Sequence, residues 1–301
     1  MEKKTADNTV LIGPAGWSYP DWVGTVYGGP AKTPKLPLIA GWFNLAEVNN
    51  SFYRIPEARH AQSWVDQVAD FPDFRFSAKL FQDFTHEGKI DGDQVRAFHA
   101  FLQPLAESGR LAALLIQFPW SFRATPHNRE HAERLFAIFR EYPLAMEVRH
   151  TGWWDAPSLD LLREHRVAIV NVDQPQFADN IGPQSEVTSS LAYVRFHGRN
   201  ADAWWAKEEA YPGARYDYLY SHEELVEWGE RIKVTVMKAK HTLVVMNNHH
   251  RGDAIINGME IAALLNEQKG TVPRGLAELY PDRVAALALP FESESQGDLF
   301  D

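Results

Sequence analysis

The sequence predicts a single (β/α)8 barrel of the TIM type, and three observations lead to this fold. Short apolar runs alternate with longer segments of helical pattern, which is typical of parallel βαβ units. There are eight such units, the number that closes a barrel. No Gly-rich phosphate loop follows an early strand, whereas the competing doubly wound sheet would normally carry one. We therefore place a barrel at residues 10–270, followed by a C-terminal extension at 271–301 that ends in a flexible acidic tail.

The predicted strands are short apolar segments bounded by turn residues. The clearest one begins after Pro143, ends before Gly152 and contains an alternating Ala-Met-Glu-Val-Arg run. The eight segments with this pattern are Val10–Trp17, Leu45–Tyr53, Phe74–Leu80, Leu111–Phe118, Leu144–His150, Val167–Asp173, Leu191–His197 and His241–Asn248.

The predicted helices follow the strands and carry apolar residues at helical spacing. In the segment 127–142, for example, Leu135, Ile138 and Phe139 fall on one face. The segments of this kind are Leu36–Phe43, Ala58–Ala69, Asp93–Glu107, His127–Tyr142, Pro157–His165, His222–Lys238 and Asp253–Glu267. An aromatic loop at 198–221 is longer than a normal βα connection, which favours a function, such as that of a lid, over mere linkage.

The composition excludes several classes of protein. The chain has 301 residues, no cysteine and a formal net charge of −10. Without cysteine there is neither a disulfide nor a thiolate metal site, and the acidic balance argues against an extended nucleic-acid-binding face. The first residues lack the apolar core of a signal peptide, and no apolar run approaches the roughly 20 residues that span a bilayer. We expect a cytoplasmic protein with no membrane partner.

Polar side chains gather at the carboxyl ends of the predicted strands, where a barrel of this type has its active site. A packed barrel interior needs Val, Ile and Leu, so inward polar residues in this number indicate a functional site. The structural alternative is a set of ion pairs at the barrel mouth, such as Glu47–Arg149 or Asp173–Arg195. The strand-end residues are Glu47, Asn49, Lys79, Gln117, Glu147, Arg149, Asp173, Arg195, His197, Asn247 and Asn248.

The chemistry of these residues predicts acid–base catalysis on a small anionic substrate. Arg149, Arg195 and Lys79 are suited to bind its phosphate or carboxylate group. Glu147 is the first candidate for a catalytic acid or base, because alternation places it on the same strand face as Arg149. The further catalytic candidates are His197, Glu47 and Asp173, and the further substrate contacts are Asn49, Gln117, Asn247, Asn248 and Trp17.

The cofactor requirement stays open. Carboxylates together with His86, His150 or His197 offer ligands for a divalent ion, but no spacing matches a metal signature, so we assign no metal site. The adjacent histidines His249 and His250 fit a surface loop. Paired carboxylates and an aromatic rim keep carbohydrate processing as a further alternative, although the sequence does not give the separation of the carboxyl groups.

Several of these segments together resemble the YecE-like family, a domain of unknown function (number seventy-two). The resemblance runs in the family's order over residues 10–267. It implies a TIM barrel, which agrees with the strand count, and it implies no activity. Met246 departs from the aromatic residue that the family commonly has there. The matching residues are Gly16–Tyr19 with Trp22, Glu47–Tyr53, Phe76–Lys79 with Thr85 and His86, Leu115–Pro119, Glu147–His150 with Trp153, Arg195–Gly198, Tyr216–Trp228, and Asn247 and Asn248 with Ala254.

The C-terminal tail suggests a function of another class. Residues 296–300, Gln-Gly-Asp-Leu-Phe, resemble the bacterial sliding-clamp-binding pentapeptide. In that case Leu299 and Phe300 would enter an apolar groove, Gln296 would bind its rim, and the protein would be a DNA-maintenance accessory factor. The alternative is a solvated tail whose Leu299 and Phe300 fold back onto the barrel.

Overall fold

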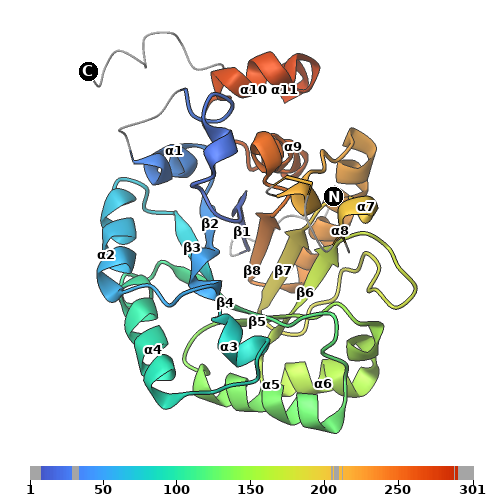
Figure 1. Cartoon of the computed structure of the whole chain (residues 1–301). Coiled ribbons are helices and arrows are strands. Elements are labelled where there is room, and N and C mark those ends of the chain that lie inside the picture. The colour runs from blue at the N-terminus through green and yellow to red at the C-terminus, as the bar shows by residue number, and fades with distance from the viewer. Residues whose placement is uncertain are drawn as a thin grey trace.

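Eight parallel strands form a nearly closed barrel surrounded by helices, as the sequence predicts (Figure 1). The computed structural model describes residues 8–28, 34–204, 206, 210–211, 213–287 and 289–290. Hydrogen-bonded neighbours follow the order β1-β8-β7-β6-β5-β4-β3-β2. The strands are β1 Thr9–Pro14, β2 Leu45–Val48, β3 Arg75–Lys79, β4 Leu111–Gln117, β5 Leu144–Glu147, β6 Ala168–Asp173, β7 Leu191–Phe196 and β8 His241–Met246.

The helical segments expected from periodicity are present, with ends that differ by a few residues. They are α1 Lys35–Trp42, α2 Ala58–Gln67, α4 Gly92–Glu107, α5 Pro126–Ile138, α6 Ala156–Glu164, α8 His222–Lys238 and α9 Asp253–Leu265. Several strands stop earlier than expected, because short helical turns take over directly at the barrel mouth. The turns are η1 Pro20–Trp22, η2 Asn50–Phe52, η3 Thr151–Trp154, η4 Ala214–Tyr216 and η5 His250–Gly252, and the short helices are α3 Gln82–Thr85 and α7 Ala201–Trp204.

A side chain completes the seam between β1 and β2. The Ile12 backbone N–H donates to Asn44 Oδ1 at 2.7 Å, and Asn44 Nδ2 donates to the Val10 carbonyl at 2.9 Å. Direct backbone pairing resumes at the mouth, where the Gly16 N–H donates to the Glu47 carbonyl at 2.9 Å. The amide of Asn44 therefore supplies two of the bonds that a regular ladder would make, and the barrel closes just below the strand ends.

Small residues make space inside the barrel for large polar ones. Gly13 of β1 lies so close to β2 that a Cβ there would sit 1.7 Å from the Leu45 carbonyl oxygen. The strand register puts further small side chains on the inner face, and the long side chains of Tyr193 and Arg195 share that face. The small inner residues are Ala15, Ala113, Ala145 and Ala168.

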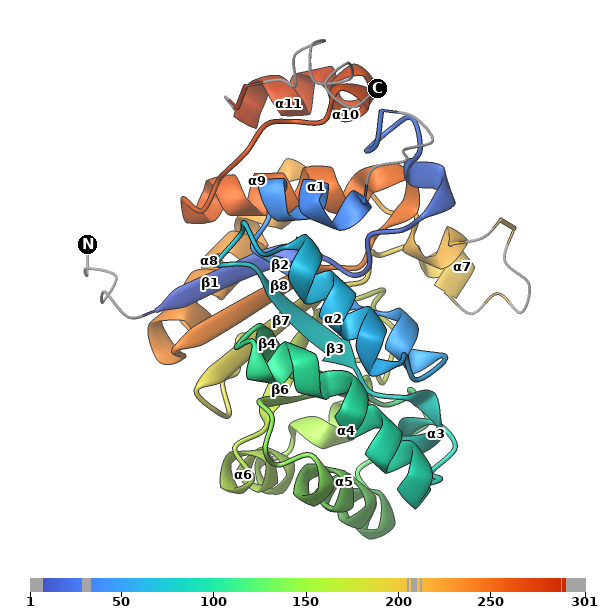
Figure 2. The ribbon, with the colours of Figure 1, turned by 90° about the vertical axis from the view of Figure 1, so that its left-hand side faces the viewer.

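Two further helices occupy the predicted C-terminal extension, where sequence patterning predicted no element. They are α10 Arg274–Leu279 and α11 Pro281–Leu287, and Figure 2 shows them beyond α9. Tyr280 donates a hydrogen bond to Asp253 Oδ1 at 2.5 Å, and Arg283 pairs with Glu260 at 2.9 Å. These short helices escape periodicity because each has few turns; α11 packs against α9, and α10 packs against α11. The tail residues Gln296, Leu299 and Phe300 lie outside the described residues.

In the part of the chain that the structure describes, no helix has both the length and the apolar character needed to cross a membrane.

Candidate functional site

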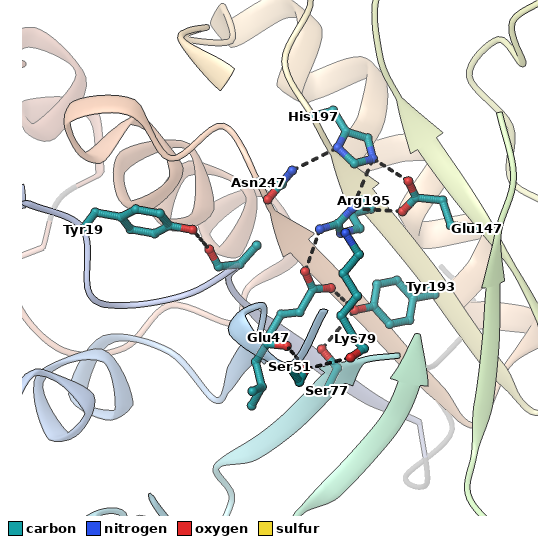
Figure 3. Close-up of polar contacts among 12 residues, drawn as sticks. Tyr19, Glu47, Ser51, Ser77, Lys79, Glu147, Tyr193, Arg195, His197 and Asn247 are labelled. Atoms are coloured by element: carbon teal, nitrogen blue, oxygen red, sulfur yellow. Dashed lines mark hydrogen bonds and ion pairs between the residues drawn. The ribbon is translucent and has the colours of Figure 1, made fainter. Parts of the chain in front are cut away.

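A buried arginine organises the carboxyl end of the barrel (Figure 3). Arg195 Nη2 donates to Glu47 Oε1 at 2.7 Å, and Arg195 Nη1 donates to Glu147 Oε2 at 3.0 Å. Both carboxylates are fully buried, and Arg195 is 1% exposed. Burial alone would lower the pKa of Arg195. The two carboxylates outweigh burial and raise that pKa above its ordinary value, so the guanidinium stays charged. The arginine thus joins β2 to β5 and neutralises charges that would be costly alone.

The network continues from Glu47 to the opposite wall. Tyr193 donates its hydroxyl proton to Glu47 Oε2 at 2.7 Å. Ser77 Oγ lies 3.0 Å from the same hydroxyl and, since that proton is already used, donates to it. Burial and the Glu47 carboxylate raise the pKa of Tyr193 well above its ordinary value, so the phenol stays protonated. Both oxygens of Glu47 are therefore occupied.

A histidine closes the other side of the network. His197 Nε2 lies 3.0 Å from Glu147 Oε1, and Asn247 Nδ2 lies 3.0 Å from His197 Nδ1. Because the amide nitrogen can only donate, Nδ1 accepts and Nε2–H donates to Glu147. Burial lowers the pKa of His197 to about 3 against the opposing effect of Glu147, which fits a neutral ring.

Glu147 accepts hydrogen bonds from three sides. Besides Arg195 and His197, Arg149 Nη2 donates to Glu147 Oε1 at 3.1 Å. Burial alone would raise the pKa of Glu147, but His197 and the two guanidinium groups outweigh it and hold that pKa well below the ordinary range. Glu147 is thus an anion at neutral pH. The pairs Glu47–Arg149 and Asp173–Arg195, named as examples of the structural alternative, are wrong in their partners, because Arg195 binds both Glu47 and Glu147.

A cavity of about 480 Å³ opens over this network. Of the predicted site residues, those on its wall are Trp17, Asn49, Lys79, Gln117, Arg195 and Asn247. Two buried polar atoms of these residues, Arg195 Nε and Asn247 Oδ1, have no hydrogen-bond partner among the described residues. A buried donor and a buried acceptor without partners are unusual, and together they favour a ligand-binding role for the cavity.

Lys79 differs from the other charged residues of the site. It ends β3, it is 7% exposed, and its Nζ lies 3.7 Å from the centroid of the Phe52 ring. Within the described ranges, no carboxylate lies within ion-pair distance of this amine. Burial, reinforced by Arg195, lowers the pKa of Lys79 to about 7 although Glu147 and Glu47 oppose the shift.

Two predicted site residues lie on the other face of their strands. Asp173 faces the helix layer, where it accepts hydrogen bonds from Arg199, Tyr220 and Trp228 at 2.5–2.8 Å. Asn248 also faces outward, and its Nδ2 donates to the Tyr218 carbonyl at 3.0 Å. Their expected place in the barrel mouth is therefore wrong: the inward residues of β6 near its carboxyl end are Val170 and Val172, which pair in register with Tyr193 and Arg195.

Sequence reasoning missed part of the cavity wall. Tyr19, Tyr216 and His249 line it, with the Tyr19 ring stacked on His249 at a centroid distance of 4.1 Å. His249 was expected in a surface loop, but Trp22 Nε1 donates to its carbonyl at 2.6 Å and fixes it beside the cavity. Tyr19 belongs to the Gly16–Tyr19 segment that resembles the family, so the sequence did offer a reason to include it in the site. Trp204 of the long loop lies 5.0 Å from the Arg149 guanidinium, so part of that loop reaches the site.

The described residues contain no cluster of three histidine, aspartate or glutamate side chains that is able to hold a metal ion. The carboxylates at the barrel mouth are instead neutralised by arginine.

Comparisons with known proteins agree on one family. The family profile described as "Protein of unknown function DUF72" matches residues 11–281. The UPF0759 protein YunF of Bacillus subtilis (strain 168) is 30% identical over 285 residues, which cover 89% of this chain and 99% of YunF.

Solved structures show the same relationship. A DUF72 family protein from Enterococcus faecalis V583 aligns with a TM-score of 0.76 and 27% identity, over 86% of this chain and 96% of that one. Another from Thermotoga maritima MSB8 aligns with a TM-score of 0.74 and 33% identity, over 86% of this chain and all of that one.

Proposed function

The chain belongs to the DUF72 family of proteins of unknown function, and from that premise we propose that it is an enzyme that acts by acid–base chemistry on a small anionic substrate. The proposed substrate site is the cavity at the carboxyl ends of the strands, the position at which barrels of this type carry their active sites. The observation that carries the proposal is Lys79, a buried amine on the cavity wall without a carboxylate partner among the described residues.

The charge of the site supports an anionic substrate. Three basic side chains, Lys79, Arg149 and Arg195, stand against two carboxylates, Glu47 and Glu147. When Lys79 is protonated, the group carries a net positive charge that an anion would neutralise. In a buried site such a charge interacts more strongly with a ligand than it would in water.

The terminal nitrogens of Arg195 are already engaged by carboxylates, so a bidentate contact with the substrate would have to displace them. We therefore assign the anion contact to Lys79, to the Arg195 Nε–H and to the amides of Asn49 and Gln117. Lys79, Arg195, Asn49 and Gln117 all line the cavity, and the two amides add donors without adding charge.

Lys79 is also our candidate for proton transfer. A group with a pKa of about 7 is populated in both protonation states at neutral pH, which is what general acid–base catalysis needs. Glu147 and His197 were the first candidates from sequence, but neither lies on the cavity wall. Their polar atoms are engaged with each other, with Arg195 and with Asn247. We propose that they, with Glu47, position Arg195 and Arg149 at the floor of the site.

The two alternatives from sequence differ in their support. Carbohydrate processing needs two carboxyl groups that flank a substrate, whereas Glu47 and Glu147 are joined through one guanidinium. Attachment to the bacterial sliding clamp rests on residues 296–300 alone and is compatible with an enzymatic barrel, because a tail can localise an enzyme.

A ligand screen tests the proposal. Wild type and Lys79→Met are heated with small phosphates, carboxylates, sugars and divalent metals at pH 7, and the melting temperatures are compared. We expect an anion to stabilise wild type and a Lys269→Met control, whose lysine is half-buried elsewhere, but not Lys79→Met. A panel in which no anion stabilises wild type, or in which one stabilises Lys79→Met equally, would contradict the proposed function.

A further inference from the structure

We propose that Lys79 is a nucleophile that forms an imine with a small anionic aldehyde or ketone, of which a 2-oxo carboxylate is the simplest type. The inference rests on the proposed function and deepens it, because it names the substrate class and the bond that forms.

The backbone and surroundings of Lys79 hold its amine at the cavity. Ser51 Oγ donates to the Lys79 carbonyl at 2.6 Å, and this bond fixes the end of β3. The side chain is 7% exposed and lies on the cavity wall with Gln117 and Asn247. The Phe52 ring packs against Nζ at 3.7 Å. The amine is therefore shielded from bulk water while it faces a space that a small molecule can enter.

The electrostatic surroundings favour the reactive, neutral form of the amine. Only an unprotonated amine has the lone pair that attacks a carbonyl carbon. Burial and the Arg195 guanidinium lower the pKa of Lys79 to about 7, while Glu147 and Glu47 act in the opposite direction. At pH 7 roughly half of Lys79 is then neutral, against roughly one in a few thousand for an ordinary lysine.

The polar groups beside Lys79 define the rest of the substrate. The Arg195 Nε–H has no partner in the described residues and, with the amides of Asn49 and Gln117, it suits a carboxylate next to the carbonyl. Asn247 Oδ1, the orphan acceptor, suits the hydroxyl group of the carbinolamine that precedes the imine. A neutral, apolar carbonyl compound would leave these groups unsatisfied, which costs binding energy.

The reaction balances without an oxidant or a reductant. The Nζ lone pair forms a bond to the carbonyl carbon, and the carbonyl oxygen leaves as water with the two protons that the amine has lost. The imine then takes up one proton from solvent. The resulting iminium withdraws electrons from the neighbouring carbon, so a proton on that carbon becomes easier to remove. Lys79 is then bonded to the substrate, so in this reaction it acts as the nucleophile and not as the proton-transfer group.

Reductive trapping tests this proposal on the wild-type chain. The protein is incubated at pH 7 with glyoxylate and cyanoborohydride, and the carboxymethylated lysines are located by peptide mass spectrometry. We expect Lys79 to be modified roughly a hundredfold faster than Lys89, which is exposed and paired with Glu87. Lys269 is the matched buried control, because it is half-buried but its Nζ donates to the Ala40 carbonyl outside the cavity.

Two further arms make the outcome specific. Butanal, a neutral aldehyde, should label Lys79 at least tenfold more slowly than glyoxylate, and Asn247→Ala should slow the reaction with glyoxylate. Equal labelling of Lys79, Lys89 and Lys269 would overturn the proposal, and so would equal labelling of Lys79 by both aldehydes. Oxalate, an anion without a reactive carbonyl, distinguishes a failure of the imine proposal from a failure of the anion site. If oxalate stabilises wild type but not Lys79→Met while trapping fails, the imine is wrong and the anion site stands.

Discussion

Arg195 of β7 and Glu47 of β2 are 2.7 Å apart across the barrel, although their strands are not neighbours in the sheet. The pair lies in a space that alanine and glycine residues on several strands leave open. It connects the chemistry of the mouth to the stability of the fold, since each charge is buried and depends on the other.

The first prediction concerns this arginine. Arg195→Met should lower the free energy of unfolding by about 3–5 kcal/mol, because Glu47 and Glu147 would be left buried without their common partner. Urea denaturation at pH 7 measures the change. Arg96→Met removes an exposed pair with Asp93 and should change stability by less than about 1 kcal/mol. Similar values for the two variants would show that the buried network does not stabilise the barrel.

The second prediction concerns the pH dependence that His197 causes. Its folded-state pKa of about 3 lies below its ordinary value, so the unfolded chain binds a proton that the folded chain does not. The stability from this group is complete above about pH 6.5 and falls with decreasing pH, by about 1.4 kcal/mol per unit, until pH 3.

Urea midpoints of wild type and His197→Gln between pH 7 and pH 4 test this prediction. The variant should lose less stability over that range than wild type. The control is His127→Gln at an exposed position of α5, which should behave as wild type. A His197→Gln curve parallel to that of wild type would mean that folding does not lower the pKa of His197.

The third prediction concerns the seam between β1 and β2. Gly13→Ala should destabilise the protein by about 3 kcal/mol or more, because the new Cβ would meet the Leu45 carbonyl oxygen at 1.7 Å and force the strands apart. Gly41→Ala in α1 meets no atom within 4 Å and should leave stability unchanged or raise it by up to about 1 kcal/mol. Thermal unfolding of both variants measures the contrast, and a stable Gly13→Ala variant would contradict the close approach.

The fourth prediction concerns the tail. If residues 296–300 bind a bacterial sliding clamp, the full chain should bind it at micromolar concentration, and deletion of Gln296–Asp301 should abolish binding. The double variant Leu299→Ala and Phe300→Ala should do the same, while Lys79→Met should bind normally. Absence of binding by the intact chain in solution removes the clamp hypothesis without affecting the barrel site.

Strand alternation was enough to predict that Glu47, Glu147 and Arg195 face the barrel interior, but not which of them pair. Once Arg195 and His197 share one face of β7, the closed barrel brings them to the inward carboxylates Glu47 and Glu147. The same reasoning failed at Asp173, because polar residues on β6 were assumed to point inward. Its partners Arg199, Tyr220 and Trp228 follow later in the chain, and only the packed structure reveals that they satisfy a carboxylate behind the sheet.

The lowered pKa of Lys79 could not be predicted from the sequence. A lysine at a strand end predicts a cation, and alternation says only which face it takes. The lowered pKa depends on burial and on the Arg195 guanidinium, which comes from a strand on another side of the barrel. The residues Tyr19, Tyr216 and His249 were missed for a similar reason, because loops bring them to the cavity from three different parts of the chain.

The most direct test of the account is the titration of Lys79 by NMR. Protein with isotope-labelled lysine is followed from pH 5 to pH 11, and the Lys79 signal is assigned with Lys79→Arg. We predict a midpoint near pH 7 for Lys79, well below the ordinary lysine value of about 10.4. A Lys79 midpoint near the ordinary value of about 10.4 would contradict the account, because the lysine would then be a fixed cation at neutral pH, able to bind an anion but not to exchange protons or attack a carbonyl.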